Sequence, residues 1–175
     1  MKKILPLLAI SALFATQVFA QKPAEDKSKR PSPPATVMQK ISSGATITIN
    51  YSQPSIKGRT IGKDIEPMEG KVWRTGANEA TTFQTDKDLT IDGSKLPAGK
   101  YSLFTLFTGD NVEVIFNKVA EQWGAFKYEM KDDALRIKTK AENNSPMAEK
   151  LMFMVKPDGM VSMHWGNKKV SFMVK

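Results

Sequence analysis

The amino-acid sequence predicts an all-β protein, a single antiparallel β-sandwich of the jelly-roll or immunoglobulin-like kind that follows a signal peptide and a disordered linker. Two observations support this prediction. Short runs rich in β-branched and aromatic residues, several of them alternating apolar with polar, recur between residues 36 and 175. Turn-forming residues separate these runs, and no amphipathic segment is long enough to indicate a regular helix.

The first twenty residues are expected to be a secretory signal peptide. Lys2 and Lys3 precede an apolar run over residues 4–14, and small residues lead up to Ala20. The run is too short to cross a bilayer, which takes about 20 residues. The chain has no cysteine that could accept a lipid. We therefore expect an exported protein, periplasmic or extracellular after cleavage near Ala20, with neither a membrane span nor a lipid anchor.

Residues 21–35 are expected to be a disordered linker, because four prolines and six charged residues among fifteen cannot bury apolar area. The remaining residues, 36–175, then form one domain. A domain of this size buries roughly 68% of the surface of its unfolded chain, so it needs no disulfide.

The charge of the chain argues against a nucleic-acid partner. Removal of residues 1–20, which hold two lysines and no acid, lowers the formal net charge from +8 to +6. Only four residues are arginines, and the lysines are scattered along the chain. Nucleic-acid binders instead concentrate Lys and Arg in patches.

Strands are expected at residues 37–41, 45–51, 81–83, 89–91, 101–107, 112–116, 135–139, 151–155, 160–165 and 170–174. Asp92 and Gly93 predict a hairpin turn. Both faces of 101–107 are largely apolar, which is typical of a central strand covered on each side. Short helical turns are expected near 131–134 or 148–151.

Two polar loops supply the candidate site. Residues 52–71 form a long loop without periodicity, and loops of this length are usually functional or disordered. The densest polar cluster of the chain follows it, in the segment WRTGANE at residues 73–79. If these loops meet in space, the candidate ligand-binding residues are Lys57, Arg59, Trp73, Arg74, Asn78 and Glu79.

The chemistry of these side chains suits recognition of a glycan or of a small anionic ligand. Arg59 and Arg74 can hold a carboxylate or phosphate through two parallel hydrogen bonds. Asn78 offers both a donor and an acceptor. Trp73 or Trp123 can stack on a sugar ring, although tryptophans in a sandwich more often fill the core, and we expect at least two of the three to do so.

The chain also resembles a known family. The segments YSQPSIKGRTIG, VWRTGANEATTF and LPAGKYSLFTL, with the later QWGAFKY and DDALRIK, closely resemble an exported bacterial family known as domain of unknown function 2911. The resemblance covers about residues 32–175. It implies an exported, β-rich single domain and assigns no catalytic residue.

Several chemistries are excluded or disfavoured by the residues present. With one histidine, His164, and no cysteine, zinc sites built from several His or Cys ligands and cysteine nucleophiles cannot form within one chain. His164 lies in a predicted strand, where a partly buried histidine bonded to the backbone is more typical than a catalytic base. The sequence therefore predicts no metal site and no cofactor.

Methionine-rich strands near the end of the chain raise a separate hypothesis. Soft thioethers and an imidazole can hold Cu(I). Strand-spaced methionines among Leu, Phe and Val are more typical of a core, because methionine is an adaptable filler of apolar gaps. The residues concerned are Met152, Met154, Met160, Met163 and Met173.

Three functions remain open: a cell-envelope binding domain, a glycan hydrolase, and a structural or protein-interaction domain without a small ligand. A hydrolase would need Glu79 to face a second carboxylate across a cleft, supplied by Asp64, Glu66 or Glu69. Glu79 pairing with Arg74 or Arg59 is the simpler expectation. Binding is favoured over catalysis because a catalytic set is incomplete.

Overall fold

The computed structural model describes residues 25–143 and 145–175, so the expected signal peptide lies outside the described residues. Two short 3-10 helices occur, η1 (Lys27–Lys29) and η2 (Met130–Asp132). The strands of the described residues are β1 (Pro34–Lys40), β2 (Thr46–Ser52), β3 (Val72–Trp73), β4 (Thr81–Thr85), β5 (Leu89–Ile91), β6 (Ser94–Leu96), β7 (Gly99–Thr108), β8 (Asn111–Asn117), β9 (Asp133–Glu142), β10 (Ala148–Val155), β11 (Met160–Gly166) and β12 (Lys168–Met173).

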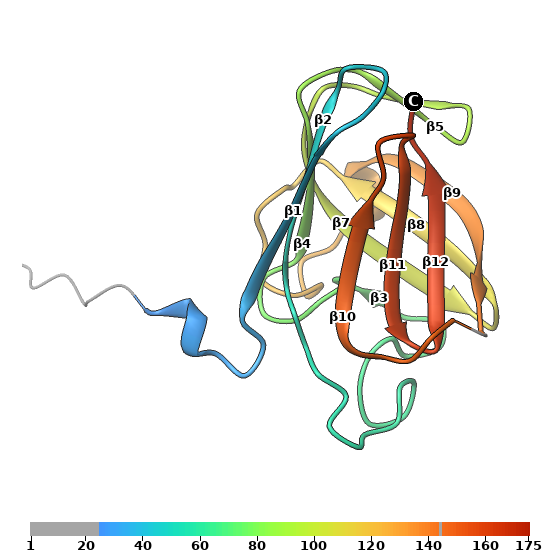
Figure 1. Cartoon of the computed structure of the whole chain (residues 1–175). Coiled ribbons are helices and arrows are strands. Elements are labelled where there is room, and N and C mark those ends of the chain that lie inside the picture. Colours follow the sequence, from blue (N-terminus) through green and yellow to red (C-terminus); the bar gives the residue numbers. More distant parts are fainter. Residues whose placement is uncertain (1–24, 144) are drawn as a thin grey trace, which may run out of the picture.

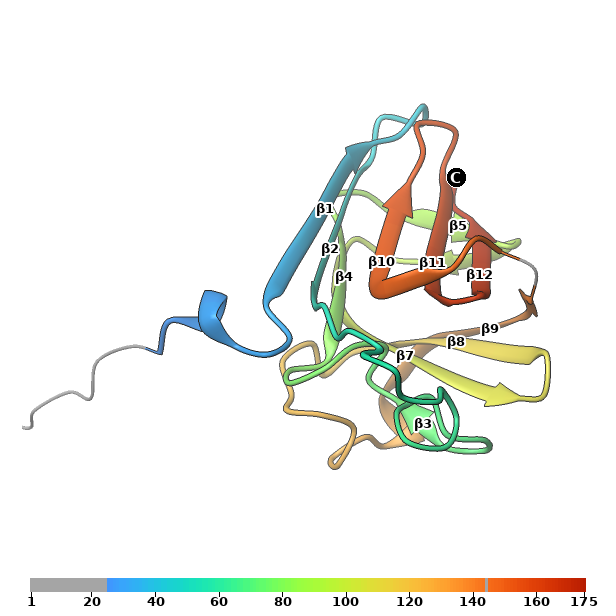
Figure 2. The ribbon, with the colours of Figure 1, turned by 60° about the horizontal axis from the view of Figure 1, so that its bottom comes forward.

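One large antiparallel sheet curls into a nearly closed, barrel-like sandwich (Figures 1 and 2). The strand order is β1-β2-β4-β7-β8-β9-β12-β11-β10, and β3 pairs with β7 beside this path. Backbone hydrogen bonds bring the edge strand β10 close to the segments that follow β1 and β2. The Ser42 amide donates to the carbonyl of Pro157 over 2.7 Å, and the Leu151 amide donates to the carbonyl of Pro54 over 3.0 Å. The predicted antiparallel β-sandwich is thus confirmed.

The core lies inside this curled sheet. Inward residues alternate with outward ones along the strands, as the period-2 pattern predicts. Phe116 is fully buried, and its ring meets those of Phe83 and Phe172 edge to face, with centroids 5.2 and 5.8 Å apart. β7 is buried on both faces, because Leu103 enters the main core and Phe104 packs under an outer cluster. The expected central strand is confirmed.

Loops cover the two ends of the barrel. The β5-β6 hairpin turns at Asp92 and Gly93, both with positive φ, and lies at the upper end in Figure 1 near the C-terminus. The long loop 53–71 lies at the lower end. Trp165 secures this loop by donating from Nε1 to the carbonyl of Glu66 over 2.8 Å.

Three expectations differ from the structure. Residues 25–35 of the expected linker contain η1 and the start of β1, because Arg30 pairs with acidic side chains and Pro34 occupies the first position of an edge strand, where proline is tolerated. Residues 148–151 belong to a strand, whereas the helical turn near 131–134 is present as η2. Met152 and Met154 point outward on β10, so the core interpretation is wrong for these two methionines.

Candidate functional site

The WRTGANE loop is tightly bonded and locally strained. Trp73 is buried and donates from Nε1 to the carbonyl of Gly76 over 3.0 Å. Thr75 is fully buried with a φ of 52°, which is unfavourable for a β-branched residue. Hydrogen bonds hold it there, because its carbonyl accepts from the Thr81 hydroxyl over 2.8 Å. Strain of this kind persists only where surrounding structure enforces it, and it concentrates at functional sites.

The two polar loops do meet. Arg59 and Arg74 line a cavity of about 360 Å³, here called the arginine cavity, together with Asp64 and Glu66. Trp73 and Trp165 form part of its wall, although both side chains are buried in the core. Of the predicted ligand-binding residues, the structure brings together Arg59, Trp73 and Arg74.

The two arginines of this cavity have different surroundings. Arg59 donates from Nε to the carbonyl of Ile56 over 3.0 Å and from Nη2 to the carbonyl of Ser55 over 2.6 Å. Two of its three guanidinium nitrogens therefore bond to the backbone of its own loop. The Nε atom of Arg74 is buried and has no hydrogen-bond partner within the described part of the chain. Arg74 is therefore the better candidate for meeting an external acceptor.

The remaining candidates lie elsewhere. Lys57 is exposed outside the arginine cavity, and its amide donates to the Glu149 carboxylate over 2.7 Å. Asn78 donates to the Ser32 carbonyl over 3.1 Å, a contact that connects the loop to the segment before β1. The single six-residue site predicted from the sequence is thus divided, because Glu79 enters a second cavity.

Glu79 pairs with residues of the N-terminal segment, so the expected pairing with Arg59 or Arg74 is wrong. Its carboxylate accepts from Lys27 and from Arg30, each over 2.8 Å. The reason lies in the backbone. Glu79 itself, two residues before β4, forms a β-bridge with Trp123, and its side chain lines a different cavity from Arg74.

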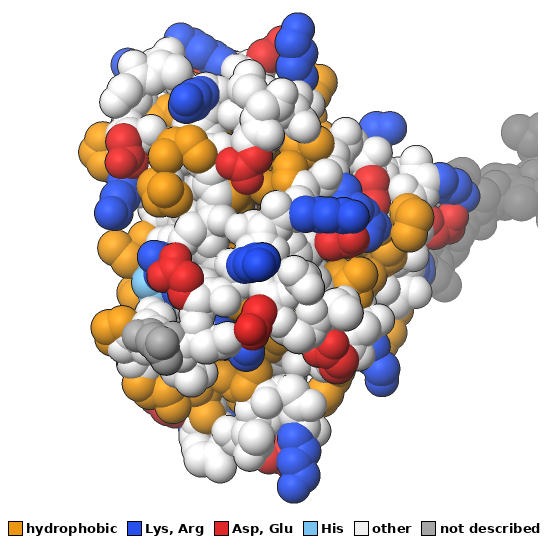
Figure 3. Space-filling view, turned by 90° about the vertical axis from the view of Figure 1, so that its right-hand side faces the viewer, with side chains coloured by type: hydrophobic (Ala, Val, Ile, Leu, Met, Phe, Trp, Pro, Cys, Tyr) orange, Lys and Arg blue, Asp and Glu red, His pale blue; other side chains and the backbone are white. Residues whose placement is uncertain are grey.

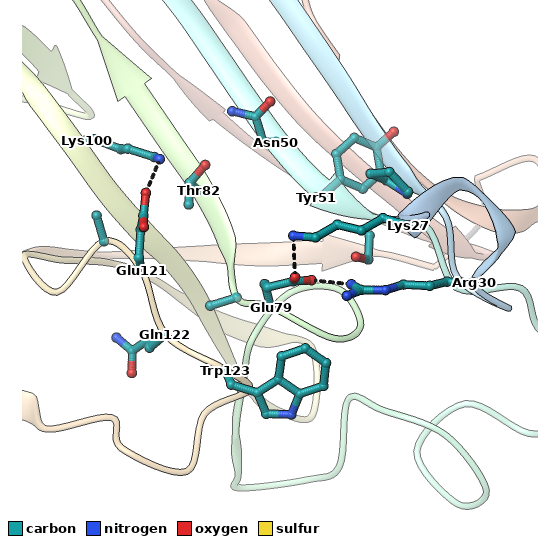
Figure 4. A pocket seen from close by; sticks show the side chains of 14 residues that line it. Lys27, Arg30, Asn50, Tyr51, Glu79, Thr82, Lys100, Glu121, Gln122 and Trp123 are labelled. Carbon is teal, nitrogen blue, oxygen red and sulfur yellow. Dashed lines mark hydrogen bonds and ion pairs between the residues drawn. The ribbon is translucent and has the colours of Figure 1, made fainter. Parts of the chain in front are cut away.

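The second cavity measures about 490 Å³ and is here called the tryptophan cavity (Figure 4). Trp123 stands at its edge with 55% of its surface exposed, whereas Trp73 and Trp165 are each 2% exposed. The expectation that two of three tryptophans fill the core is confirmed. The other labelled lining residues in Figure 4 are Lys27, Arg30, Asn50, Tyr51, Glu79, Thr82, Lys100, Glu121 and Gln122.

The backbone fixes the position of Trp123. The Ala80 amide donates to the carbonyl of Gln122 over 2.9 Å, and the Gly124 amide donates to the carbonyl of Asn78 over 3.1 Å. Arg30 lies over the indole with its guanidinium carbon 5.8 Å from the ring centroid, a cation–π contact. The indole is therefore held in place while more than half of it remains accessible.

Two polar atoms, in side chains that line this cavity, have almost no accessible surface and no hydrogen-bond partner among the described residues. They are the Thr82 hydroxyl and the Oε1 atom of Gln122. The Gln122 amide is anchored from its other end, because Nε2 donates to the Val119 carbonyl over 2.9 Å. Buried polar atoms normally have partners, so these two mark a place where water or a ligand supplies them.

The charged groups of the tryptophan cavity are paired with one another. Lys27 and Arg30 pair with Glu79, and Lys100 pairs with Glu121 over 2.8 Å. Burial favours a raised pKa for Glu79, but the hydrogen bonds from Lys27, from the backbone and from Arg30 outweigh it and lower the pKa to about 2. The hydrogen bond from Lys100 likewise lowers the pKa of Glu121. Both carboxyl groups are thus ionised at neutral pH.

The carboxylates expected to face Glu79 do not do so. Asp64 and Glu66 line the arginine cavity, and Glu69 accepts from the Gly109 amide over 2.7 Å. The second carboxylate of the tryptophan cavity is Glu121 instead. A glycosidase needs one carboxylic acid that stays protonated until it donates its proton, which requires a raised pKa. Neither Glu79 nor Glu121 has one.

Comparison with known proteins gives one result. The family described as "Protein of unknown function (DUF2911)" matches residues 32–174. The chain belongs to this family. The family membership expected from the sequence is confirmed, and both cavities are lined mainly by residues inside the matched DUF2911 region. No curated protein and no solved structure matches the chain.

Within residues 25–143 and 145–175, no three or more His, Asp or Glu side chains gather closely enough to hold a metal ion. The described part of the DUF2911 protein also contains no helix with the length and apolar character needed to cross a membrane.

Sequence reasoning missed much of the tryptophan cavity. Lys27 and Arg30 belong to a segment assigned to a linker on composition, and Gln122 and Thr82 carry no motif. One available signal was Trp123 itself, which sits next to Gly124 in the QWG segment outside any predicted strand. A tryptophan in a loop is less constrained to the core than one within a strand pattern.

Proposed function

We propose that this domain is a binding module for a saccharide, held in the tryptophan cavity. The observation that carries the proposal is the exposed Trp123 indole beside the unpartnered polar atoms of Thr82 and Gln122. An indole face offers a broad apolar surface on which the C–H face of a sugar ring can stack. The volume of about 490 Å³ falls within the usual range for small-ligand sites.

The polar groups of the cavity suit hydroxyl groups. A sugar hydroxyl can donate to Oε1 of Gln122 and exchange a hydrogen bond with the Thr82 hydroxyl, so both buried atoms would gain partners. Lys27, Arg30 and Lys100 already pair with carboxylates, which reduces their attraction for a strongly anionic ligand. A neutral or weakly acidic glycan therefore suits this cavity better than a phosphate.

Binding without hydrolysis is the better interpretation of the two carboxylates. Glu79 and Glu121 share the cavity, as a glycosidase would need, but the pKa of each is lowered. An ionised pair of carboxylates can accept hydrogen bonds from sugar hydroxyls and cannot supply the proton that a leaving group requires. With the export expected from the N-terminal sequence, the natural source of such a ligand is a cell-envelope glycan.

The proposal is tested by calorimetric titration of the mature protein with envelope monosaccharides and short oligosaccharides. Trp123→Ala should weaken binding by about tenfold or more, since stacking of a nucleic-acid base on an aromatic side chain, a comparable contact, contributes on the order of 1–3 kcal/mol. Phe126→Ala is the matched control, since Phe126 is exposed nearby and does not line the cavity. Binding that survives in Trp123→Ala, or loss of binding in Phe126→Ala, would contradict the proposed site.

A second candidate function rests on Arg74. Its buried and unpartnered Nε atom in the arginine cavity favours a small carboxylate or phosphate ligand, since a guanidinium can bind either through two parallel hydrogen bonds. Thermal shifts with acetate, a uronic acid and phosphate would test this function beside Arg74→Lys. Lysine keeps the positive charge but lacks the paired N–H donors of a guanidinium. A ligand-induced rise in melting temperature that persists in Arg74→Lys would therefore exclude recognition through two parallel hydrogen bonds.

A further inference from the structure

The outer face of β10 and β11 carries an unusual set of soft donor atoms. β10 alternates buried Leu151 and Phe153 with outward Met152 and Met154, which are 40% and 42% exposed. These two methionines therefore do not fill the core. The register places Met152 directly opposite His164 and Met154 directly opposite Ser162 on β11.

The orientation of the imidazole brings it toward both methionines. Nε2 of His164 lies 3.2 Å from the Ser162 hydroxyl, and Ser162 is the residue opposite Met154. Directly opposed side chains have Cβ atoms about 5 Å apart, and diagonal neighbours lie about 7–8 Å apart. A methionine has three rotatable bonds that move its sulfur over such distances. Both thioethers can therefore approach Nε2.

The other ring nitrogen is held separately. Nδ1 of His164 lies 3.4 Å from the Ser145 hydroxyl, a contact that can take the ring proton and make Nε2 the acceptor nitrogen. A metal ion on Nε2 would then replace the 3.2 Å contact with the Ser162 hydroxyl. The neighbouring cation, Lys169, pairs with Glu142 over 3.1 Å, so its charge is offset. Figure 3 shows the pale-blue histidine on the molecular surface, with hydrophobic side chains on one side of it and side chains of both charges on the other.

We propose that Met152, Met154 and His164 form a binding site for a soft monovalent metal ion, Cu(I) or its analogue Ag(I). Thioether ligands select soft ions, and imidazole is an accepted ligand of copper. The set contains no carboxylate, so Mg²⁺ and Ca²⁺, which require oxygen ligands, have no basis for binding here. Two sulfurs and one nitrogen supply the three ligands of a trigonal Cu(I) site.

The test uses the mature protein, residues 21–175, and anaerobic Cu(I) titration in competition with a chromogenic chelator. We expect one equivalent of Cu(I) to bind. The double substitution Met152→Leu with Met154→Leu keeps the apolar volume but removes both sulfurs, and His164→Gln removes the imidazole. Each should weaken binding by at least about tenfold, the lower range reported even for residues that only support metal ligands.

Met130→Leu provides the matched control, because Met130 is an exposed methionine on η2, which precedes β9 and is not part of the β10–β11 pair. It should bind Cu(I) as the parent does. A parallel titration with Ag(I), followed through the methyl signals of the methionines by NMR, should shift Met152 and Met154 first. Unchanged affinity in the double variant, or equal shifts at Met130, would overturn the proposal. Thermal unfolding of each metal-free variant distinguishes loss of ligands from loss of fold.

Discussion

Glu79 links the N-terminal segment to the domain, and Glu79→Gln tests this link. The carboxylate accepts from Lys27 and Arg30 over 2.8 Å in each case, and these pairs hold η1 beside the tryptophan cavity (Figure 4). Glutamine has nearly the same shape but no charge. The substitution therefore removes the electrostatic part of the link and leaves the packing intact.

The magnitude follows from the pKa of Glu79. A fall from its ordinary 4.5 to about 2 would correspond to about 3 kcal/mol if the carboxylate were shielded from solvent. The side chain of Glu79 is 40% exposed, and exposed ion pairs contribute about 0.2–1 kcal/mol. We therefore expect Glu79→Gln to lower the free energy of unfolding by about 1 kcal/mol at neutral pH.

The pH dependence gives a second check. Because the folded-state pKa is lowered, the contribution of Glu79 is present above the unfolded pKa and is lost as the pH falls from about 4.5 to about 2. Urea unfolding followed by circular dichroism at several pH values measures this. The difference between parent and variant should shrink toward zero in acid.

The matched control for this experiment is Glu121→Gln. Glu121 lines the same cavity and pairs with one lysine, but it is 82% exposed, so its substitution should leave the stability almost unchanged. Equal stability of parent and Glu79→Gln at neutral pH would refute the reasoning. A difference in the free energy of unfolding between parent and Glu79→Gln that stays the same at low pH would refute it as well.

Two further predictions concern the backbone and a tyrosine. Gly159→Ala should destabilise the fold by more than about 2 kcal/mol in thermal unfolding, because φ is +94° and the added Cβ would lie 1.9 Å from the carbonyl oxygen of Val174. Gly93→Ala, with positive φ but open space, should cost only about 1 kcal/mol, and equal losses would show that the contact is unimportant. Burial and the hydrogen bond with Asp133 raise the pKa of Tyr128 to about 12, so ultraviolet titration should show one tyrosine ionising last, and Tyr128→Phe should remove that phase.

Local patterns predicted the strands well, because buried and outward positions of a strand correspond to apolar and polar residues that alternate along the sequence. The strands around Ile47 and Ile49, and the doubly buried strand through Leu103, follow from this alternation. The turn at Asp92 follows equally from turn chemistry. These features depend on neighbours in sequence.

The candidate site was predicted only in part, because it depends on which side of a loop each side chain takes. The sequence left open whether the two loops meet; Arg59 and Arg74 do line one cavity, but Glu79 lines the other. Composition placed Arg30 in a linker, since a single ion pair with a distant carboxylate leaves no periodic signal. The outward direction of Met152 was likewise hidden, because methionine is common in cores.

The unpartnered atoms of the tryptophan cavity connect its structure to its proposed ligand. Leaving a buried polar atom without a hydrogen bond costs about 1–3 kcal/mol, and a domain is stable by only about 5–15 kcal/mol. In the free protein, a small rotation of the Thr82 and Gln122 side chains toward the cavity would let water satisfy these two atoms. A ligand that displaces such water must reproduce its hydrogen bonds or lose affinity. Sugar hydroxyls can form these hydrogen bonds. The exposed indole of Trp123 can at the same time stack on the apolar face of the sugar ring. The combination therefore selects a molecule that has both.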